Sequence, residues 1–328
     1  MTNTVDEVLS GVDLREKICV ITGATSGLGL MTARGLASAG ATVVIAGRDP
    51  QRLRSAAEAL TTETPNAAVE TVELELDSLA SVRRAGAEIN DRFARVDVLI
   101  NNAGVMFTPY QRTRDGFELQ LGVNHLGHFD LTRALIPLLL NAGSARVVNL
   151  SSDAHLVFDI DLEDPNWEQR PYDKFQAYGA AKTANVLFTV ALDERYRGSG
   201  VRSFAVHPGT VATSLSRYMS RDDMKAMMGM GSADRDPSAP RPRLEVIPVE
   251  QGAATSVWAA VSDELAGRGG LYLADCAISE NAKPYAMDPQ RAERLWTISG
   301  QLCPSDRPQN RILRAASTLQ ADGAVDGG

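Results

Sequence analysis

Tyr178 and Lys182 stand four residues apart in the stretch Tyr-Gly-Ala-Ala-Lys. If this stretch is helical, the spacing brings both side chains to one face, where the ammonium can stabilise a phenolate. A free phenol has a pKa of about 10, so it needs such a neighbour to exchange protons near neutral pH. The pair therefore indicates acid–base chemistry, although a Tyr-xxx-Lys pair by itself is also typical of a solvated helix face.

A glycine-rich turn, TGATSGLG over residues 22–29, follows the apolar run 18–21 and leads into a helical pattern. Glycines in such a turn allow backbone N–H groups to approach a pyrophosphate at the helix N-terminus. The spacing GxxxGxG differs from the P-loop, which needs a following Lys-Ser/Thr pair, and from the GxGxxG fingerprint. The turn indicates dinucleotide binding, and the alternative is a glycine-rich turn without a ligand.

Arg48 follows the second apolar run, where folds that choose NAD carry an acidic residue for the ribose 2′-hydroxyl. The planar fork of donors on an arginine suits a 2′-phosphate instead. The adjacent Asp49 is expected to cap a helix that has Pro50 at its first position. These residues predict NADP(H) as the cofactor, in preference to NAD.

Further polar motifs follow the remaining apolar runs. Asn-Asn-Ala-Gly occupies positions 101–104, Asn124 lies in a long helical pattern, Ser151 and Ser152 end the fifth run, and Pro-Gly-Thr occupies 208–210. In order and spacing, these motifs, the glycine turn and the Tyr-xxx-Lys pair resemble the classical short-chain dehydrogenase/reductases. The resemblance extends over most of the chain, from about Leu14 to Ala277.

The resemblance implies a catalytic role for four residues. Tyr178 would donate or accept the proton, and Lys182 would lower its pKa and hold the nicotinamide ribose. Ser152, the second member of the strand-end pair, would polarise the carbonyl group. Asn124 would hold a water that links Lys182 to solvent. The implied reaction is hydride transfer between nicotinamide and a carbonyl carbon, with no metal.

The resemblance also implies a cofactor site. The glycine turn would bind the pyrophosphate, Asp77 the adenine, and Asn102 and Ala103 the adenosine side. Pro208 and Thr213 would flank the nicotinamide. The full set of expected cofactor-binding residues is Gly23, Thr25, Ser26, Gly27, Leu28, Gly29, Arg48, Asp77, Asn102, Ala103, Gly104, Tyr178, Lys182, Pro208, Gly209 and Thr213.

The separation of 26 positions between Ser152 and Tyr178 is about twice that of the family's smaller members. With Asn-His-Leu-Gly-His-Phe at 124–129 and Val-His-Pro-Gly-Thr-Val at 206–211, it resembles the retinol dehydrogenase and WW-domain oxidoreductase branch. The branch implies a bulky hydrophobic alcohol or ketone as substrate, such as a steroid, retinoid, polyketide or xenobiotic. Arginine outnumbers lysine, as expected of a bacterial member from a GC-rich genome.

Strand and helix patterns alternate along the chain, and several strands are apolar on both faces. This arrangement predicts an α/β, Rossmann-type, doubly wound parallel sheet of about seven strands with helices on both faces. The expected strands are 18–21, 42–45, 69–76, 96–100, 146–150, 201–206 and 270–273. The expected helices are 28–39, 51–62, 79–93, 116–140, 177–197 and 250–263.

We expect one domain over residues 14–303, preceded by an N-terminal extension at 1–13 and followed by a mobile C-terminal tail at 304–328. Residues 153–174 are expected to form a surface excursion. The Met-rich segment 214–248 is predicted to cover the substrate, and its alternative is ordinary packing. The long helices at 116–140 and 177–197 resemble those that pair across subunits, so a homodimer or homotetramer is expected, although the branch also contains monomers.

Composition excludes several classes of protein. The 328 residues carry 33 basic and 41 acidic side chains, so no basic field favours nucleic acid. Three distant cysteines fit a reduced cytoplasmic interior. No apolar run reaches the roughly 18 residues of a membrane span, and the first 15 residues lack the pattern of a signal peptide.

The same residues allow three alternative interpretations. A hydrolase built on Ser152 and His155 is disfavoured because the chain has no GxSxG nucleophile elbow. A metal site at His125, His128 and Asp130 is disfavoured because the three would not share one helical face. A non-catalytic NADP-binding sensor or scaffold is the main alternative to an enzyme, and the presence of all four expected catalytic residues favours the enzyme.

Overall fold

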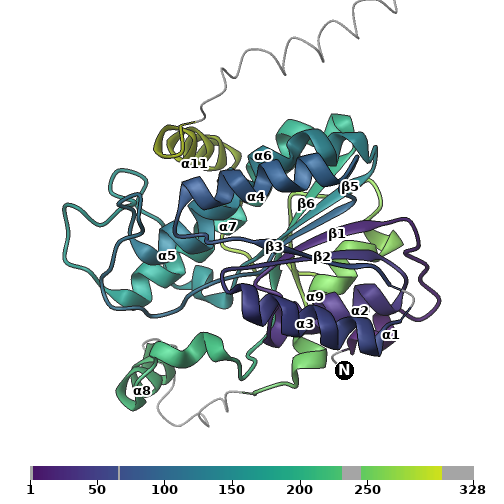
Figure 1. The fold of residues 1–328 in the computed structure, drawn as a ribbon. Helices are drawn as coiled ribbons and strands as arrows, with labels where there is room; N and C mark the ends of the chain where they lie inside the picture. The colour runs from purple at the N-terminus through teal and green to yellow at the C-terminus, as the bar shows by residue number, and fades with distance from the viewer. Residues whose placement is uncertain (1–2, 66, 231–244, 305–328) are drawn as a thin grey trace, which may run out of the picture.

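The computed structural model describes residues 3–65, 67–230 and 245–304. One sheet forms the centre of the molecule, in the strand order β3-β2-β1-β4-β5-β6-β7-β8, and only the β7–β8 pairing is antiparallel (Figure 1). The doubly wound α/β fold expected from the sequence is therefore confirmed. The strands are β1 (Ile18–Thr22), β2 (Thr42–Gly47), β3 (Val69–Glu73), β4 (Val98–Asn101), β5 (Ala145–Leu150), β6 (Val201–His207), β7 (Leu271–Ala274) and β8 (Ala277–Ile278).

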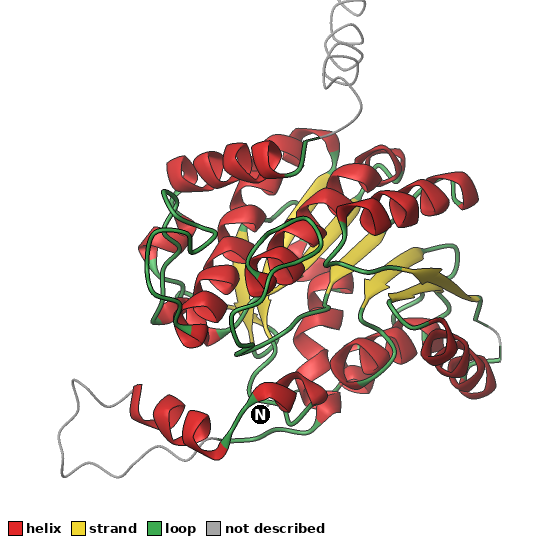
Figure 2. Ribbon diagram, turned by 60° about the vertical axis from the view of Figure 1, so that its left-hand side comes forward, coloured by secondary structure: helices red, strands yellow, loops and turns green. Residues whose placement is uncertain are grey.

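Helices cover both faces of this sheet, as Figures 1 and 2 show. One layer contains α4, α6, α7 and α11, and the other contains α1, α2, α3 and α9. Each layer packs its apolar side chains on one face of the strands, which explains why β1, β2, β4 and β5 are almost wholly buried. The helices are α1 (Val5–Val8), α2 (Gly27–Ser38), α3 (Pro50–Glu63), α4 (Leu79–Arg92), α5 (Leu119–Leu121), α6 (Gly127–Asn141), α7 (Lys174–Tyr196), α8 (Arg221–Met230), α9 (Val249–Val261), α10 (Pro284–Met287) and α11 (Pro289–Leu302).

The eighth strand is one that the apolar pattern does not reveal. β8 has only two residues, and it pairs with β7 through the register Leu273↔Ile278 and Ala274↔Ala277. The two connecting residues, Asp275 and Cys276, both have positive φ, at 51° and 54°. Such a turn matches the twist of a two-residue hairpin, so β8 follows from turn geometry rather than from hydrophobicity.

The helix expected over 116–140 is divided in the structure. Gly116 lies in a turn with φ of 87°, and the side chain of Glu118 caps α5 by accepting hydrogen bonds from the backbone N–H groups of Gln120 and Leu121. A π-helical turn, Gly122–Leu126, then joins α5 to α6. The extra residue in such a turn frees backbone groups from the regular helical ladder, and π-turns of this kind often occur at functional sites.

Both ends of the described chain pack onto the domain. Val5 of α1 lies against α2 at Gly35, where an added Cβ would come within 2.3 Å of the Val5 side chain. At the other end, Trp296 of α11 packs edge-on against Phe129 of α6 at 5.1 Å between ring centroids and stacks on Phe188 of α7. The expected mobile tail lies outside the described residues, except for residue 304.

Two segments leave the regular alternation. Residues 153–174 begin with a 3₁₀ turn and then form a loop that buries Ile160, Leu162 and Trp167 against the domain. In the predicted covering segment, a 3₁₀ turn (Ser214–Tyr218) precedes α8, and Ile247 returns to the sheet edge by a bridge to Val211. Residues 231–244 of that segment lie outside the described residues. No helix in the described ranges is both long and apolar enough to cross a bilayer.

Candidate active site

A cavity of about 880 Å³ opens at the carboxyl ends of the parallel strands. Its walls come from the segments that follow β1 to β6, and it lies where strand order reverses between β1 and β4. Open α/β sheets bind their ligands at this switch point. Every expected cofactor-binding residue lines the cavity, and so do Ser152, Tyr178 and Lys182; Asn124 does not.

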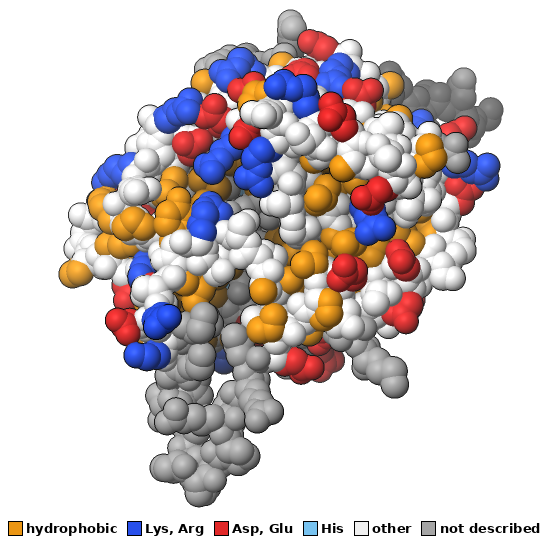
Figure 3. Space-filling view, turned by 60° about the horizontal axis from the view of Figure 1, so that its bottom comes forward, with side chains coloured by type: hydrophobic (Ala, Val, Ile, Leu, Met, Phe, Trp, Pro, Cys, Tyr) orange, Lys and Arg blue, Asp and Glu red, His pale blue; other side chains and the backbone are white. Residues whose placement is uncertain are grey.

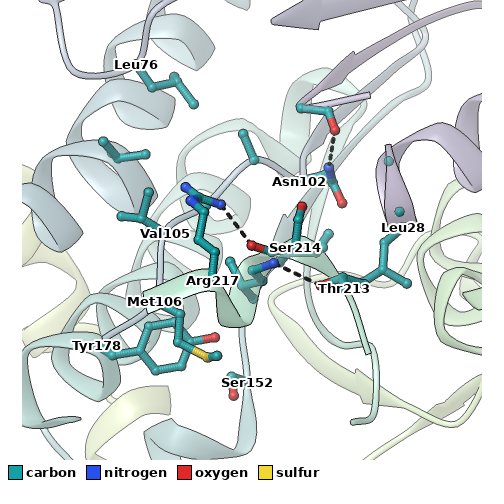
Figure 4. A pocket seen from close by; sticks show the side chains of 18 of the residues that line it. Leu28, Leu76, Asn102, Val105, Met106, Ser152, Tyr178, Thr213, Ser214 and Arg217 are labelled. Carbon is teal, nitrogen blue, oxygen red and sulfur yellow. Dashed lines mark hydrogen bonds between the residues drawn. The ribbon is translucent and has the colours of Figure 1, made fainter. Parts of the chain in front are cut away.

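Figure 4 shows the two ends of this cavity. Asn102 and Leu28 lie at one end, whereas Tyr178 and Ser152 lie together at the other. On the face brought forward in Figure 3, basic and acidic side chains are interspersed with apolar ones rather than gathered into one charged field.

The start of α2 is suited to an anion. Its N-cap residue, Ser26, makes no side-chain capping bond, and the first turn contains no acidic residue. By contrast, α3 and α7 are capped by the carboxylates of Asp49 and Asp173. Because the first N–H groups of α2 lack a side-chain acceptor and face the cavity, the helix end can accept a phosphate group.

Close contact between two loops fixes the glycine turn. An added Cβ on Gly23 would lie 2.9 Å from the Cα of Ala103, and one on Gly29 would lie 2.5 Å from the side-chain nitrogen of Asn102. That nitrogen donates to the carbonyl oxygen of Thr22 at 2.7 Å. The glycines therefore let the Asn-Asn-Ala-Gly loop dock directly on the turn after β1.

Two arginines line the cavity beside the end of β2. Arg48 and Arg52 both reach it, and within the described part of the chain neither forms an ion pair. The Asp49 carboxylate between them accepts hydrogen bonds from the backbone N–H groups of Gln51 at 2.9 Å and Arg52 at 3.2 Å. It therefore acts as the helix cap expected from the sequence. The sequence reasoning missed Arg52, although its place in the first helical turn after Arg48 could have indicated it.

The opposite end contains the acid–base pair. Tyr178 and Lys182 lie on α7, and the Lys182 ammonium is 5.5 Å from the centre of the Tyr178 ring. The ammonium also donates to the carbonyl oxygen of Leu150 at 3.0 Å. Burial raises the pKa of Tyr178 to about 12, while the Ser152 hydroxyl acts in the opposite direction. Burial lowers the pKa of Lys182 to about 8.

These shifts define the protonation states at neutral pH. Tyr178 carries its proton, and most Lys182 side chains carry a positive charge. A phenol that keeps its proton beside a buried cation is a proton donor. The pair is therefore set up to give a proton to an oxygen that becomes negatively charged.

The two serines after β5 have different surroundings. The Ser151 hydroxyl is buried and donates to the backbone carbonyl of Lys182 at 2.9 Å. The Ser152 hydroxyl accepts a bond from the backbone N–H of Ala154 at 3.2 Å and lies near Tyr178 (Figure 4). Because its own hydrogen is not used in that bond, Ser152 can donate to a carbonyl oxygen beside Tyr178.

Asn124 lies behind the cavity rather than in its wall. Its side-chain oxygen accepts from the backbone N–H of Val105 at 2.8 Å, and its side-chain nitrogen donates to the carbonyl of Val105 at 2.9 Å. Both polar groups of the side chain are thus used to hold the loop after β4. The backbone carbonyl of Asn124, in the π-helical turn, takes no part in these two bonds.

The wall near Tyr178 is apolar. The Phe107 ring contacts those of Phe175 and Tyr178, with centroids 4.6 and 5.2 Å apart. Met106 and Phe158 pack against the same cluster. Phe107 was not predicted from the sequence. Its φ of 53° lies in the left-handed region, and nothing in the adjacent sequence indicates this conformation.

The residues of the alternative sites have other partners. His155 forms a hydrogen bond from Nδ1 to the backbone carbonyl of Ser152 at 2.7 Å, so the pair has no nucleophile–base geometry. His125 bonds to Ser299, and Asp130 pairs with Arg83. The described part of the chain contains no group of three side chains placed to hold a metal ion.

A family model, similar sequences and similar structures all relate this chain to short chain dehydrogenases. The family model for short chain dehydrogenases matches residues 17–224. Retinol dehydrogenase 13 of Homo sapiens is 40% identical over 295 residues, which cover 90% of this chain and 87% of the human protein. A solved structure from Mycobacterium paratuberculosis is 36% identical, with a TM-score of 0.72, and covers 94% of this chain and 100% of that one. Another, from Beutenbergia cavernae with bound NADP at low occupancy, is 26% identical, with a TM-score of 0.63, and covers 80% of this chain and 96% of that one.

Proposed function

Since the chain belongs to the classical short-chain dehydrogenase/reductase family, in the branch of the retinol dehydrogenases, we propose that it is an NADP(H)-dependent carbonyl reductase or secondary alcohol dehydrogenase. The observation that carries this proposal is a single cavity with two ends. One end offers a helix start without a side-chain cap and two arginines that form no ion pair with any described residue, and the other offers a buried Tyr178–Lys182 pair. A cofactor that spans the cavity would bring its nicotinamide to the acid–base pair.

The residues present fit such a cofactor. When bound, the nicotinamide supplies or takes up the hydride. Tyr178 donates its proton to the carbonyl oxygen as the substrate carbon becomes that of an alcohol. Ser152 donates a hydrogen bond to the same oxygen and stabilises its developing charge. Lys182 supplies a positive charge beside the phenol while the proton leaves, and the Asn124 carbonyl is its proposed link, through water, to solvent.

A preference for NADP(H) rests on the arginines after β2. Arg48 and Arg52 could bind a 2′-phosphate with charge-assisted hydrogen bonds, whereas the only carboxylate between them caps α3. Asp77, which also lines the cavity, is proposed to contact the adenine. The NADP found in the similar Beutenbergia structure agrees with this assignment.

The substrate is proposed to be a bulky hydrophobic ketone or alcohol. The aromatic cluster of Phe107, Phe175 and Tyr178 forms one side of its site. Leu215 and the half-exposed ring of Tyr218, from the segment after β6, form another. Several relatives are named as retinol dehydrogenases, and retinol is a long apolar alcohol. Residues 214–230 are therefore proposed to cover this end of the cavity.

The proposal for the oligomeric state rests on a different surface. The long helices α6 and α7, which would pair in a homodimer or homotetramer, are partly covered by α11. Trp296 packs on Phe129 and Phe188, and Arg195 pairs with Glu293. This coverage favours the monomeric arrangement that the branch also contains.

The cofactor assignment can be tested with Arg48→Ala. Loss of charge-assisted bonds worth about 1.5–3 kcal/mol should raise the KM for NADPH by about 10- to 100-fold, with little change for NADH. Arg54→Ala is a matched control, because Arg54 is an exposed arginine of α3, the helix that follows Arg48, and does not line the cavity. Equal effects of Arg48→Ala on the two cofactors would refute the assignment.

A further inference from the structure

His128 is a buried histidine of α6 that the chemistry above does not use. Its Nε2 lies 2.8 Å from the hydroxyl of Thr22, at the end of β1. Its Nδ1 lies 3.0 Å from the backbone carbonyl of Asn124, in the π-helical turn. One imidazole therefore joins the strand that leads into the glycine turn to the carbonyl proposed for the proton path.

Counting hydrogens fixes which nitrogen carries the proton. The Thr22 hydroxyl accepts hydrogen bonds from the backbone N–H groups of Asn102 and Ala103, both at 3.0 Å. With its lone pairs used in this way, the hydroxyl donates its hydrogen to Nε2 of His128. A carbonyl oxygen can only accept, so the imidazole hydrogen lies on Nδ1 and is donated to Asn124.

The surroundings keep this imidazole neutral. Burial lowers the pKa of His128 to about 4, the bond to Asn124 acts in the opposite direction, and the Lys182 charge lowers it further. The ring therefore holds one proton over the pH range in which the enzyme is expected to work. In the chain of hydrogen bonds from the backbone of 102–103 through Thr22 and His128 to Asn124, each group donates to the next one.

We propose that His128 is a positioning residue that sets two features at once, the orientation of the Asn124 carbonyl and the docking of the 102–103 turn. The proposal rests on the function proposed above. The N–H of His128 occupies one lone pair of the Asn124 oxygen, so the other lone pair has a fixed direction. Because the side chain of Asn124 is held by Val105, the π-helical turn is fixed from two sides.

The two arms of the imidazole can be separated by substitution. His128→Asn keeps an N–H donor close to the Nδ1 position and loses the partner of Thr22. His128→Gln keeps an amide close to the Nε2 position and loses the donor to Asn124. Steady-state kinetics with NADPH and one hydrophobic ketone then report on each arm, and melting temperatures report on folding.

The proposal predicts opposite patterns. His128→Asn should keep kcat within about threefold of the wild type and raise the KM for NADPH, because the Thr22 hydroxyl that holds the 102–103 turn loses the acceptor that orients it. His128→Gln should lower kcat about tenfold with little change in that KM, consistent with losing one hydrogen bond. Thr22→Val, which removes the hydroxyl alone, should reproduce the rise in KM and gives a second test if a His128 variant does not fold.

His125→Gln is the matched control, because His125 is also buried, in the π-helical turn that precedes α6, but bonds to Ser299 of α11. It should lower the melting temperature and leave kcat and KM unchanged. If both His128 variants change kcat and KM in parallel, or change neither, His128 is only structural and the proposal fails. A wild type that binds NADPH but reduces no ketone would instead refute the proposed function, and the two failures are thus distinct.

Discussion

The two ends of the cavity are built in different ways. At the end near α2, the site is formed mainly by the backbone, because glycines allow two loops to approach and the start of α2 has N–H groups without a side-chain cap. At the end near α7, the site is formed by buried side chains, and desolvation shifts the pKa values of Tyr178 and Lys182. Changes in backbone shape should therefore damage cofactor binding, whereas changes of single polar atoms should damage the chemical step.

Apart from loss of the Tyr178 hydroxyl, the largest effect that would sharpen this contrast is expected from Ser152→Ala. Removing a donor that stabilises developing charge should lower kcat about 10²- to 10³-fold, with little change in the dissociation constant of NADPH. Ser151→Ala is its neighbour control, because that hydroxyl bonds only to the backbone of Lys182. Ser151→Ala should lower kcat less than about tenfold. A larger loss of kcat in Ser151→Ala than in Ser152→Ala would show that Ser151, and not Ser152, stabilises the developing charge.

A smaller effect is expected at the other end from Gly29→Ala. The new Cβ would lie 2.5 Å from both the Asn102 side chain and the carbonyl of Gly23, so the loops must separate. A cost of about 1–3 kcal/mol, if it falls on the bound state, raises the dissociation constant of NADPH about 5- to 100-fold in a fluorescence titration. Gly300→Ala, where nothing lies within 4 Å, should bind NADPH normally. Normal binding by Gly29→Ala would break the comparison.

The pH dependence tests the desolvated end. With the pKa of Lys182 lowered to about 8, the cationic form is lost as pH rises through that value. Ketone reduction, measured as kcat/KM for NADPH, should therefore be constant near pH 7 and about tenfold lower at pH 9. Burial also lowers the pKa of His207, which stays neutral over this range, and the high pKa of Tyr178 keeps its proton in place. A flat profile to pH 10 would show that the charge of Lys182 does not limit the reaction.

The smallest effect concerns the segment proposed to cover the substrate. Lys174, at the start of α7, pairs with Asp223 of α8 at 2.7 Å, and both side chains are partly shielded from solvent. Lys174→Gln should raise the KM for the ketone by about fivefold or less, since such pairs contribute about 1 kcal/mol at most. The exposed Lys225, whose pair with Asp222 is open to solvent, provides Lys225→Gln as a control. An equal KM for the ketone in both variants would show that the position of α8 does not affect substrate binding.

The sequence predicted the fold well because strand burial and helix spacing leave direct patterns. Parallel strands covered on both faces are continuous apolar runs, and glycines with a following helix mark the turn after β1. Three elements left no such pattern. β8 depends on a turn with positive φ, the π-helical turn needs only one extra residue, and α11 lies after the last expected strand.

The site was predictable to a similar extent, and for a related reason. Residues in contiguous motifs, such as Tyr178 and Lys182, were found from spacing, and the structure brings them together with Ser152. Arg52 could have been found from its place one helical turn after Arg48, whereas Phe107 reaches the cavity only through the folding of other segments. The sequence likewise does not predict the hydrogen bond between the Asn124 side chain and the backbone of Val105, since the two residues are 19 positions apart.

The most direct test of the central claim is a paired measurement on Tyr178→Phe. Phenylalanine keeps the ring contacts with Phe107 and removes only the hydroxyl. The account predicts that the variant binds NADPH as the wild type does, while its rate of NADPH-dependent reduction across a panel of steroid, quinone, aromatic and aliphatic ketones falls about 10²- to 10⁴-fold. A variant that turns over at the wild-type rate, or a wild type that binds NADPH and reduces none of the panel, would contradict the assignment of this cavity as the active site of a carbonyl reductase.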